Sequence, residues 1–246
     1  MAITINGTNG LTTDNGALKL DTDTLVVDDT NNRVGIGTSS PASLLHLSSG
    51  SPRITLTDTG TGADHRINAD SSAGNLAFDV DYNSDTASPS AVFNIKGSER
   101  MRIDSSGRVT MPYQPSFHAY SNANLNHGTS TVTYVWNLTR HNIGNHYDTT
   151  TGRFTAPVAG RYLFNATGLQ NVGATSYYTR MYLYKNGALF LDGLNSAALQ
   201  SDYQRVDIHA VVEAAANDYF ETKFVSNNSA AFVYATYSWF SGHLLG

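Results

Sequence analysis

Carboxylate and imidazole side chains are the groups in this sequence that could act in catalysis or hold a metal ion. Hydrolysis of a glycosidic bond needs two carboxylates about 5–10 Å apart in a groove. The acidic residues that could form such a pair are Asp202, Asp207, Glu213 and Glu221. Aspartate is abundant in the turns of this chain, which accounts for these residues without catalysis. With no phosphate-binding loop, nucleophile elbow or triad spacing either, we expect no enzyme and no catalytic residue.

The eight histidines lack the spacing that metal sites show in sequence. His118, His127, His141 and His146 are neither adjacent nor part of a helical zinc motif, although a trimer could bring three copies of any of them to its axis. The chain has no cysteine, so it has no disulfide, thiol nucleophile or thiolate ligand. We expect no metal site and no cofactor.

The composition of the 246 residues indicates an all-β protein, because aspartate outnumbers glutamate and only 14% of residues are charged. The net charge of -5 and the scattered basic residues argue against nucleic-acid binding. No apolar stretch approaches the roughly 20 residues of a membrane span, so we expect no membrane insertion. Residues 1–7 lack the features of a signal peptide, and synthesis in a cytoplasm is therefore expected.

Residues 1–112 are predicted to form short strands with few apolar side chains to bury. They are rich in Thr, Ser, Asp, Asn and Gly, and their alternating runs fall at residues 25–27, 33–36, 53–56 and 101–103. Too few apolar residues are present to offset a backbone ordering cost of roughly 1–2 kcal/mol per residue, so three chains sharing one core are expected. Residues 28–34 echo residues 104–109, which predicts the same hairpin twice.

Two prolines in residues 111–115 stop any strand from running through, and we place a boundary there, between residues 112 and 113. Beyond it, aromatic residues alternate with small or polar ones, as in the core of a β-sandwich. The aromatic residues that we expect to be mostly buried are Tyr162, Phe164, Tyr182, Tyr184, Tyr237 and Trp239. Residues 211–216 have a helical propensity. A helix as short as this would be marginal.

One segment of this second region, residues 152–164, combines two turn signals with an aromatic strand. Gly152 and Gly160 offer the backbone freedom of tight turns, and Tyr162 and Phe164 share one face of the strand that follows. Further motifs lie before and after this segment, at Tyr134, Asn137, Gly144, Tyr147, Asp148, Lys185, Asn186, Gly187 and residues 240–245.

Together these motifs resemble the globular head of the complement component one q family, a tumour-necrosis-factor-like jelly roll. The resemblance covers about residues 113–246 and implies a trimeric jelly-roll sandwich knob. It also implies that residues 211–216 form a strand, not a helix, and that this strand ends in a turn at Asn217 and Asp218. Some members bind calcium through loop carboxylates, for which the candidates are Asp148, Asp192, Asp202 and Asp207. Their place in turns explains them without a metal, and we keep the expectation of none.

Residues 32–41 and 99–109 resemble modules of bacteriophage fibre shafts. This resemblance implies an N-terminal trimeric β-hairpin or β-prism-like shaft over residues 1–112, followed by the C-terminal knob over residues 113–246. The implied function is that of a homotrimeric structural fibre of the virion, most simply a tail fibre. Its N-terminus would bind phage tail or capsid proteins, and its knob a host surface glycan or protein.

The receptor site is expected in loops at the far end of the knob, where Asn and Ser could bond sugar hydroxyls and Tyr could pack on a sugar ring. These candidate residues are Asn171, Gly173, Thr175, Ser176, Tyr177, Tyr178, Asn195, Ser196, Asp202, Asn227, Asn228 and Ser229. Two alternatives stay open: a head fibre or tail spacer without receptor function, and a secreted complement-like lectin.

Overall fold

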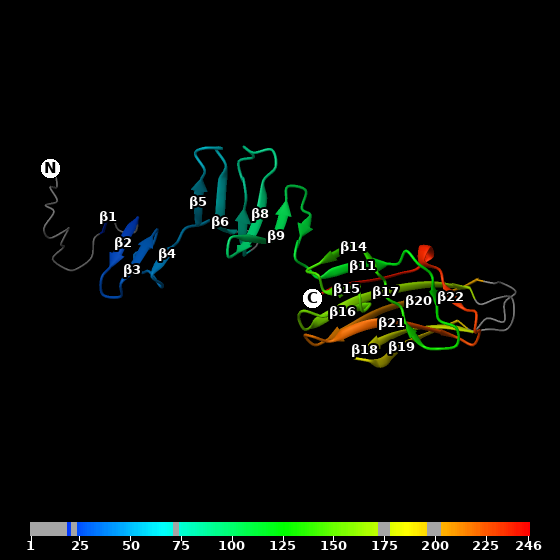
Figure 1. Ribbon diagram of the computed structural model, residues 1–246. Helices are drawn as coiled ribbons and strands as arrows, with labels where there is room; N and C mark the ends of the chain where they lie inside the picture. Colours follow the sequence, from blue (N-terminus) through cyan, green and yellow to red (C-terminus); the bar gives the residue numbers. More distant parts are fainter. Residues whose placement is uncertain (1–18, 21–23, 71–73, 172–177, 196–202) are drawn as a thin grey trace, which may run out of the picture. The chain divides into compact units, whose positions relative to one another are not determined.

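The computed structural model describes residues 19–20, 24–70, 74–171, 178–195 and 203–246 (Figure 1). The elements in these ranges are strands apart from one short 3-10 helix, η1 (Ala235–Tyr237), so the all-β prediction is confirmed. None of the described helical residues forms a segment long and apolar enough to span a membrane. The chain divides into two compact units, Met1–Thr110 and Met111–Gly246.

Unit 1 consists of three small sheets whose strands are short. The first has the order β1-β2-β3-β4, the second β5-β6-β7 and the third β10-β9-β8. Their bounds are β1 (Lys19–Leu20), β2 (Leu25–Asp28), β3 (Arg33–Ile36), β4 (Leu45–Leu47), β5 (Arg53–Thr57), β6 (Asp64–Asp70), β7 (Asn75–Asp79), β8 (Ser90–Ile95), β9 (Ser98–Asp104) and β10 (Val109–Thr110).

The echo between the two turns of unit 1 is confirmed as one hairpin device used twice. In the β2–β3 hairpin the Asp28 carboxylate accepts from the backbone N–H of Asn31 at 3.1 Å. In the β9–β10 hairpin Asp104 accepts from the backbone N–H groups of Ser106 and Arg108 at 2.9 and 3.0 Å. An aspartate that hydrogen-bonds the backbone just ahead of it closes a tight turn without help from a core.

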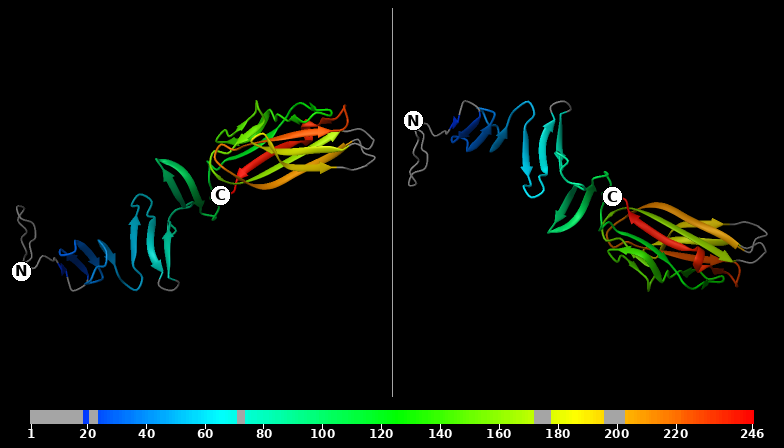
Figure 2. Two further views of the ribbon diagram at one scale, coloured as in Figure 1. Left: turned by 90° about the horizontal axis from the view of Figure 1, so that it is seen from below. Right: turned by 90° about the horizontal axis from the view of Figure 1, so that it is seen from above.

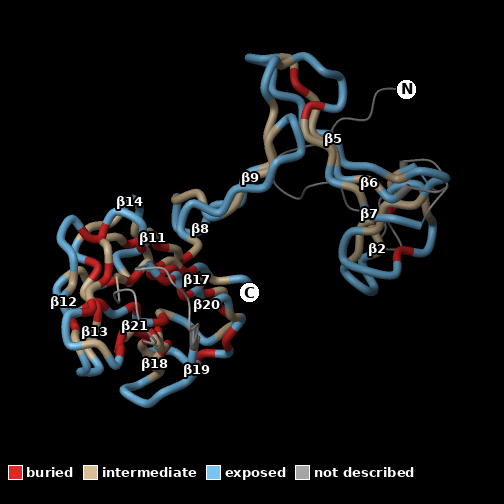
Figure 3. The backbone as a smooth tube through the Cα atoms, turned by 90° about the vertical axis from the view of Figure 1, so that its right-hand side faces the viewer, coloured by how far each residue is buried: buried red, intermediate tan, exposed pale blue. Residues whose placement is uncertain are grey.

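Unit 1 has almost no interior of its own. Among its described residues, the buried hydrophobic side chains are Val26 and Ala63. Figure 3 shows the difference: the backbone of unit 1 is mostly half-buried or exposed, whereas buried residues run throughout the second unit. Large apolar side chains such as Phe78, which is 69% exposed, therefore lie in water in the single chain.

The second unit, the head, is a sandwich of two antiparallel sheets, and its long strands run along one direction in all views (Figure 1, Figure 2). The seven-stranded sheet has the order β12-β22-β17-β23-β11-β14, with β20 also paired to β17, and the six-stranded sheet the order β15-β16-β21-β18-β19, with β13 also paired to β21. The bounds are β11 (Ser116–Tyr120), β12 (Leu125–Asn126), β13 (Val132–Thr133), β14 (Leu138–Ile143), β15 (Tyr147–Asp148), β16 (Arg153–Thr155), β17 (Gly160–Asn171), β18 (Thr179–Lys185), β19 (Ala188–Asn195), β20 (Tyr203–Ala214), β21 (Tyr219–Ser226), β22 (Phe232–Val233) and β23 (Trp239–Leu244).

Aromatic rings fill the space between these sheets. The ring of Phe117 stacks on Tyr147 and Phe154 at centroid distances of 4.8 and 4.9 Å and meets Phe240 edge-on at 4.9 Å. Such geometries add about 0.5–1.5 kcal/mol per pair to the burial of the rings. This core orders the head within one chain, so the sandwich does not depend on a partner for its interior.

Not every aromatic residue expected in the core lies there. Tyr162 and Phe164 are fully buried, whereas Tyr182, Tyr184 and Trp239 are half-buried and Tyr237 is 62% exposed. The alternation along a strand predicts that rings share a face, but it does not say which face meets the other sheet.

The structure confirms the turn predicted at Gly152 but not the one predicted at Gly160. Gly152 has φ +75°, and a Cβ there would lie 2.8 Å from the carbonyl oxygen of Tyr134. Gly160, in contrast, begins β17, and its lack of a side chain leaves room for Leu244 rather than making a turn. Residues 203–214 form the strand β20, and Asn217 follows with φ +71°, which confirms the strand and turn over the helical alternative.

Candidate functional site

Two ends of the head are distinguished by where the chain enters and leaves. The N–H of Leu244 donates to the carbonyl of Pro115 at 3.0 Å, and the side chain of Gln114 donates to the carbonyl of Leu244 at 3.0 Å. The start of β11 and the end of β23 therefore lie together at one end. The last residues of β17 and β21 and the first residues of β18 lie at the other end, which we call the distal end (Figure 1).

The described part of the predicted receptor site lies at this distal end. Asn171 ends β17, and the backbone of Asn195, which ends β19, pairs with Thr179. Thr179 also pairs with Ser226, the last residue before Asn227, Asn228 and Ser229. The remaining candidates Gly173, Thr175, Ser176, Tyr177, Ser196 and Asp202 lie outside the described residues.

Hydrogen bonds within the distal end use part of the capacity of its asparagines. The side-chain oxygen of Asn227 accepts from the N–H of Tyr178 at 2.8 Å, and that of Asn228 accepts from the N–H of Ala230 at 2.9 Å. The ring of Tyr178 lies 5.3 Å from the guanidinium of Arg180. Asn228 thus shapes its own loop, as an Asx turn does, whereas Asn227 joins that loop to the residue before β18.

A second candidate surface, which the sequence interpretation missed, is the outer face of the seven-stranded sheet. Register across β11, β23, β17 and β20 aligns its outward residues in three rows: Tyr120, Trp239, Thr167 and Asp207; His118, Ser241, Asn165 and His209; and Ser116, His243, Leu163 and Val211. We call this the outer sheet face. Val211 is 59% exposed, so the face carries apolar groups in water.

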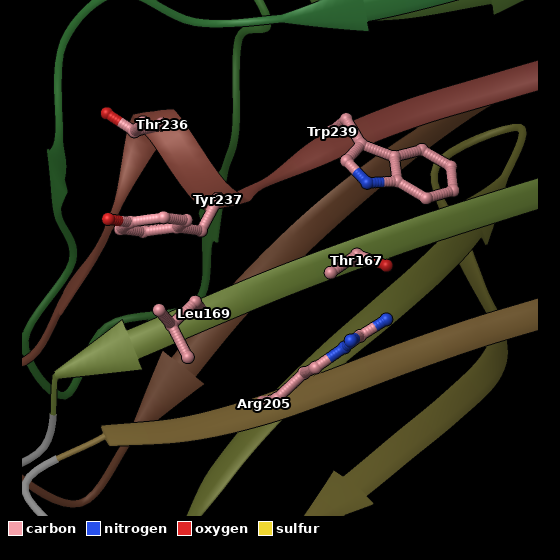
Figure 4. A pocket seen from close by; sticks show the side chains of 6 residues that line it. All are labelled: Thr167, Leu169, Arg205, Thr236, Tyr237 and Trp239. Carbon is pink, nitrogen blue, oxygen red and sulfur yellow. The ribbon is translucent and has the colours of Figure 1, made fainter.

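A hollow of about 360 Å³ opens on the outer sheet face beside the short helix η1 (Figure 4). Tyr237 and Trp239 flank it on one side and Arg205 of β20 on the other, with Thr167 and Leu169 of β17 between them. The Arg205 guanidinium is paired with Asp207 at 2.9 Å, and Asp207 also accepts from the Thr167 hydroxyl at 2.7 Å. An arginine held in place beside two partly exposed aromatic rings has the composition of a protein interface rather than of a catalytic cleft.

Trp239 separates this hollow from a smaller one of about 260 Å³, lined among others by His118, Tyr120 and Arg140. The indole of Trp239 stacks on the His118 ring at a centroid distance of 5.4 Å. Partial burial, followed by the charges of Arg140 and His141, lowers the pKa of His118. Aromatic and basic side chains thus line this smaller hollow together.

The carboxylates considered for catalysis or calcium are engaged separately. Asp148 accepts from Thr150 and Thr151, which lowers its pKa to about 2, and Asp192 pairs with Arg180 at 3.2 Å. Glu221, buried on β21, is paired with Arg153 at 2.8 Å and Lys223 at 3.2 Å, while Glu213 lies on a different sheet. Among the described residues, no group of three or more His, Cys, Asp or Glu is close enough to hold one ion.

Comparison with known proteins gives the following. No curated protein sequence matches the chain. Of solved structures, the globular domain of zebrafish complement 1qA matches at 16% identity, covering 54% of this chain and 98% of that one, with a TM-score of 0.42. Murine APRIL at pH 8.5 matches at 12% identity, with 54% and 99% coverage and a TM-score of 0.42. The tumour necrosis factor Eiger from S. frugiperda matches at 11% identity, with 54% and 93% coverage and a TM-score of 0.42.

A family comparison is more direct, because residues 116–245 match the C1q domain. These residues run from the first residue of β11 to just beyond the end of β23, and so include the whole two-sheet sandwich. They make up more than half of the chain and carry the aromatic core, the turn at Gly152 and the final strand. The chain therefore belongs to the C1q domain family.

Proposed function

We propose that the chain is the subunit of a homotrimeric fibre, in which unit 1 forms a shaft and the head binds a receptor. Domains of the C1q and tumour-necrosis-factor-like fold form homotrimers and bind receptors, which supports this role for the head. The finer proposal is a bacteriophage tail fibre whose head binds a host surface glycan.

The observation that carries the trimeric proposal is an apolar ladder across the second sheet of unit 1. Ile54 on β5, Ile67 on β6 and Phe78 on β7 are directly opposite one another, so their side chains share one face. They are 42%, 39% and 69% exposed. Leu56 and Leu76, at 61% and 64% exposed, extend the same face.

The opposite face of this sheet is polar, because Arg53, Thr55 and Thr57 alternate with the apolar residues of β5. A sheet with one apolar and one polar face needs a cover over its apolar face to be stable in water. The third sheet repeats the pattern, since Ala91, Ile103 and Val109 align across β8, β9 and β10. Identical faces from neighbouring copies would supply such a cover.

The head contributes the outer sheet face to the same assembly. Its two hollows, its partly exposed rings and Val211 give the face an interface-like composition, while its own core is complete without a partner. In a cyclic trimer each copy contacts its two neighbours through two different patches, and the outer sheet face would supply one of the two on each head.

The fibre role is supported by the phrases at residues 32–41 and 99–109, which resemble fibre-shaft modules. A head fibre or tail spacer would use the same trimer without a receptor. A secreted complement-like lectin fits the C1q domain equally well, and the shaft phrases favour the fibre over it.

The trimer is tested by paired substitutions at neighbouring positions of β5. Ile54→Asp puts a charge on the apolar face of the sheet, and Thr55→Asp puts the same charge on the polar face. By sedimentation equilibrium of the full chain, we expect wild type and Thr55→Asp to be trimers, and Ile54→Asp to dissociate or to lose order in unit 1. A monomeric, fully folded wild type at micromolar concentration refutes the proposal.

Receptor binding by the distal end is tested separately on that trimer. Asn171→Ala, Asn195→Ala and Asn227→Ala together should reduce binding of the trimer to host cells. If these changes leave a folded trimer with unchanged binding, the distal site is wrong. If the wild-type trimer binds no host surface at all, the spacer or head-fibre role replaces the receptor role.

A further inference from the structure

The interior of the head changes in composition toward its distal end. Phe224 on β21 lies across the core from Gly168 on β17, since a Cβ at Gly168 would overlap the Phe224 ring. Two residues further along these strands, on the same inward faces, are Ser226 and Gln170. They are 1% and 0% exposed, so the aromatic core gives way to buried polar side chains at the distal end.

His127 and Thr179 extend this set of buried polar residues. His127 is 5% exposed, its ring centroid lies 6.3 Å from that of Phe224, and the Gln170 amide is next to it. Thr179 on β18 is fully buried and pairs with Ser226. We call His127, Gln170, Thr179 and Ser226 the distal polar layer.

Several polar atoms of the distal polar layer make no hydrogen bond within the described part of the protein. They are Nε2 of His127, the amide oxygen and nitrogen of Gln170, and the hydroxyl of Thr179. A buried polar group without a partner costs free energy, because folding has removed it from water. The layer therefore adds less stability than the aromatic core and can open at lower cost.

His127 also holds the chain segment that contains two of the predicted receptor residues. Its Nδ1 is 3.0 Å from the carbonyl oxygen of Gly128, so in the neutral ring Nδ1 carries the proton and Nε2 does not. The N–H groups of His127 and Gly128 both donate to the Ala231 carbonyl at 3.2 Å. The N–H of Ser226 donates to the Gly128 carbonyl at 3.3 Å. Residues 226–231 are therefore joined to the distal polar layer at both ends.

Protonation of His127 is disfavoured in the closed head. Burial lowers the pKa of its imidazole from 6.5, while the Gly128 carbonyl and the Gln170 amide act in the opposite direction. Because the pKa is lower in the closed head than in an opened one, the opened state binds the proton more tightly. The stabilisation from neutral His127 is therefore complete well above pH 6.5 and is lost as the pH falls below that value.

In the described part of the head, the elements packed around His127 place no charge beside it. β17 presents Gln170, β18 Thr179 and β21 Phe224, while β12 and β22 contain no ionisable residue. Tyr134, edge-on to Phe224, is ionisable, but burial raises the pKa of its phenol and keeps it uncharged. The charged residues of the neighbouring strands alternate with the inward ones and so belong to the outer faces of the two sheets, namely Arg180, Arg205, Asp207, Glu221 and Lys223.

We propose that the distal polar layer is a pH-sensitive switch, in which neutral His127 holds residues 226–231 against the sandwich and protonated His127 releases them in mildly acidic solution. A buried imidazolium would lack a carboxylate partner, whereas water solvates it in the opened state. The change is local, because His127 is not part of the aromatic core. The released segment contains Asn227 and Asn228, so receptor binding would weaken in acid; only this consequence rests on the proposed function.

The switch is tested by hydrogen exchange of the full chain, measured by mass spectrometry in peptides that cover residues 126–131 and 223–231. After correction for the intrinsic exchange rate, the opening constant of these amides should rise as the pH falls below 6.5. Release linked to one proton raises it by up to about tenfold per pH unit. A peptide that contains Leu244, whose N–H donates to Pro115 at the other end of the head, should show no such rise. An opening constant that is independent of pH in the distal peptides overturns the switch.

His127→Asn removes the titrating ring and keeps a side-chain N–H near the position of Nδ1, from which it can still donate to the Gly128 carbonyl. Once the intrinsic rate is removed, its distal peptides should exchange alike above and below pH 6.5. His146→Asn is the matched control, because it removes a half-buried histidine that is outside the distal polar layer, and it should keep the wild-type response. A pH response that persists in His127→Asn overturns the switch.

The wild-type protein supplies a second measurement that does not depend on the folding of a variant. By NMR, the ring Cε1–H resonance of His127 should titrate with a midpoint below 6.5, in step with the backbone amides of Ser226 and Ala231. A midpoint at or above 6.5, or amides that do not follow it, contradicts the switch. Neither test uses a receptor, so a failed switch leaves the proposed function standing, and a failed receptor role leaves the switch standing.

Discussion

Val211→Asp is the sharpest test of the outer sheet face. Val211 lies in the second half of β20, its backbone pairs with Leu163, and its side chain is 59% exposed. Full burial of a valine side chain is worth about 1.5–3 kcal/mol, so burying the remaining exposed part would contribute about 1–2 kcal/mol per copy. Three copies in a cyclic trimer would then contribute about 3–6 kcal/mol.

That loss raises the trimer's dissociation constant by about two to four orders of magnitude. A carboxylate without a partner in the interface adds a desolvation penalty in the same direction. The single head should keep its fold, because the substituted side chain lies outside the core between the sheets. Dissociation should therefore occur without a fall in the melting temperature of the separated heads.

The measurement is sedimentation equilibrium over a dilution series, with circular dichroism to follow the fold. Val158→Asp is the matched control, since Val158 is 47% exposed in the turn before β17 and outside the three rows. It should associate as wild type does. If Val211→Asp dissociates no more readily than Val158→Asp, the outer sheet face is not where copies meet and the reasoning is refuted.

Two further predictions concern the head alone. Gly168→Ala should destabilise the head by about 1–3 kcal/mol, because the new Cβ would overlap the buried ring of Phe224, and chemical denaturation should show this as a lower midpoint with an unchanged slope. Hydrogen bonds from Asn186, Lys185 and Ala215 lower the pKa of Asp218 to about 2 from 3.8, so this group's stabilisation is complete above about pH 4 and is lost as the pH falls toward 2. Between pH 5 and pH 2 the melting temperature should therefore fall less steeply for Asp218→Asn than for wild type. An equal fall for both proteins contradicts the assignment.

The architecture of the head could be predicted because its signals are local. Asn186 and Gly187 both have positive φ, at +53° and +79°, as a two-residue hairpin turn requires, and the sequence shows this pair directly. Alternation likewise predicts which residues of β17 share one face. Alternation does not show which face of a strand the other sheet covers. It therefore could not distinguish the buried Tyr162 from the exposed Tyr237.

The candidate surfaces depend on non-local register, and the sequence could not predict them. His118 and His141 are matched only because β11 and β14 pair with a shift at one position, which leaves Arg140 unpaired. A slip of one residue would send one of the two rings to the other face of the sheet. The only sequence signal for the outer sheet face was the presence of Tyr203 and Val211 at outward positions of a strand whose other face is apolar.

The two units of the chain differ in whether they can bury their own apolar side chains. The head closes its own aromatic core and can fold before it associates, whereas the sheets of unit 1 have apolar faces but no interior. In the proposed trimer, association of three heads would hold three copies of unit 1 at a high effective concentration, because each unit 1 is joined to its head through Met111. Contacts such as those of Ile54, Ile67 and Phe78, too weak to gather three free chains, would then suffice to order the shaft. On this view the exposed ladder of unit 1 is stable only as a consequence of the head, and a substitution that separates the heads should disorder the shaft as well.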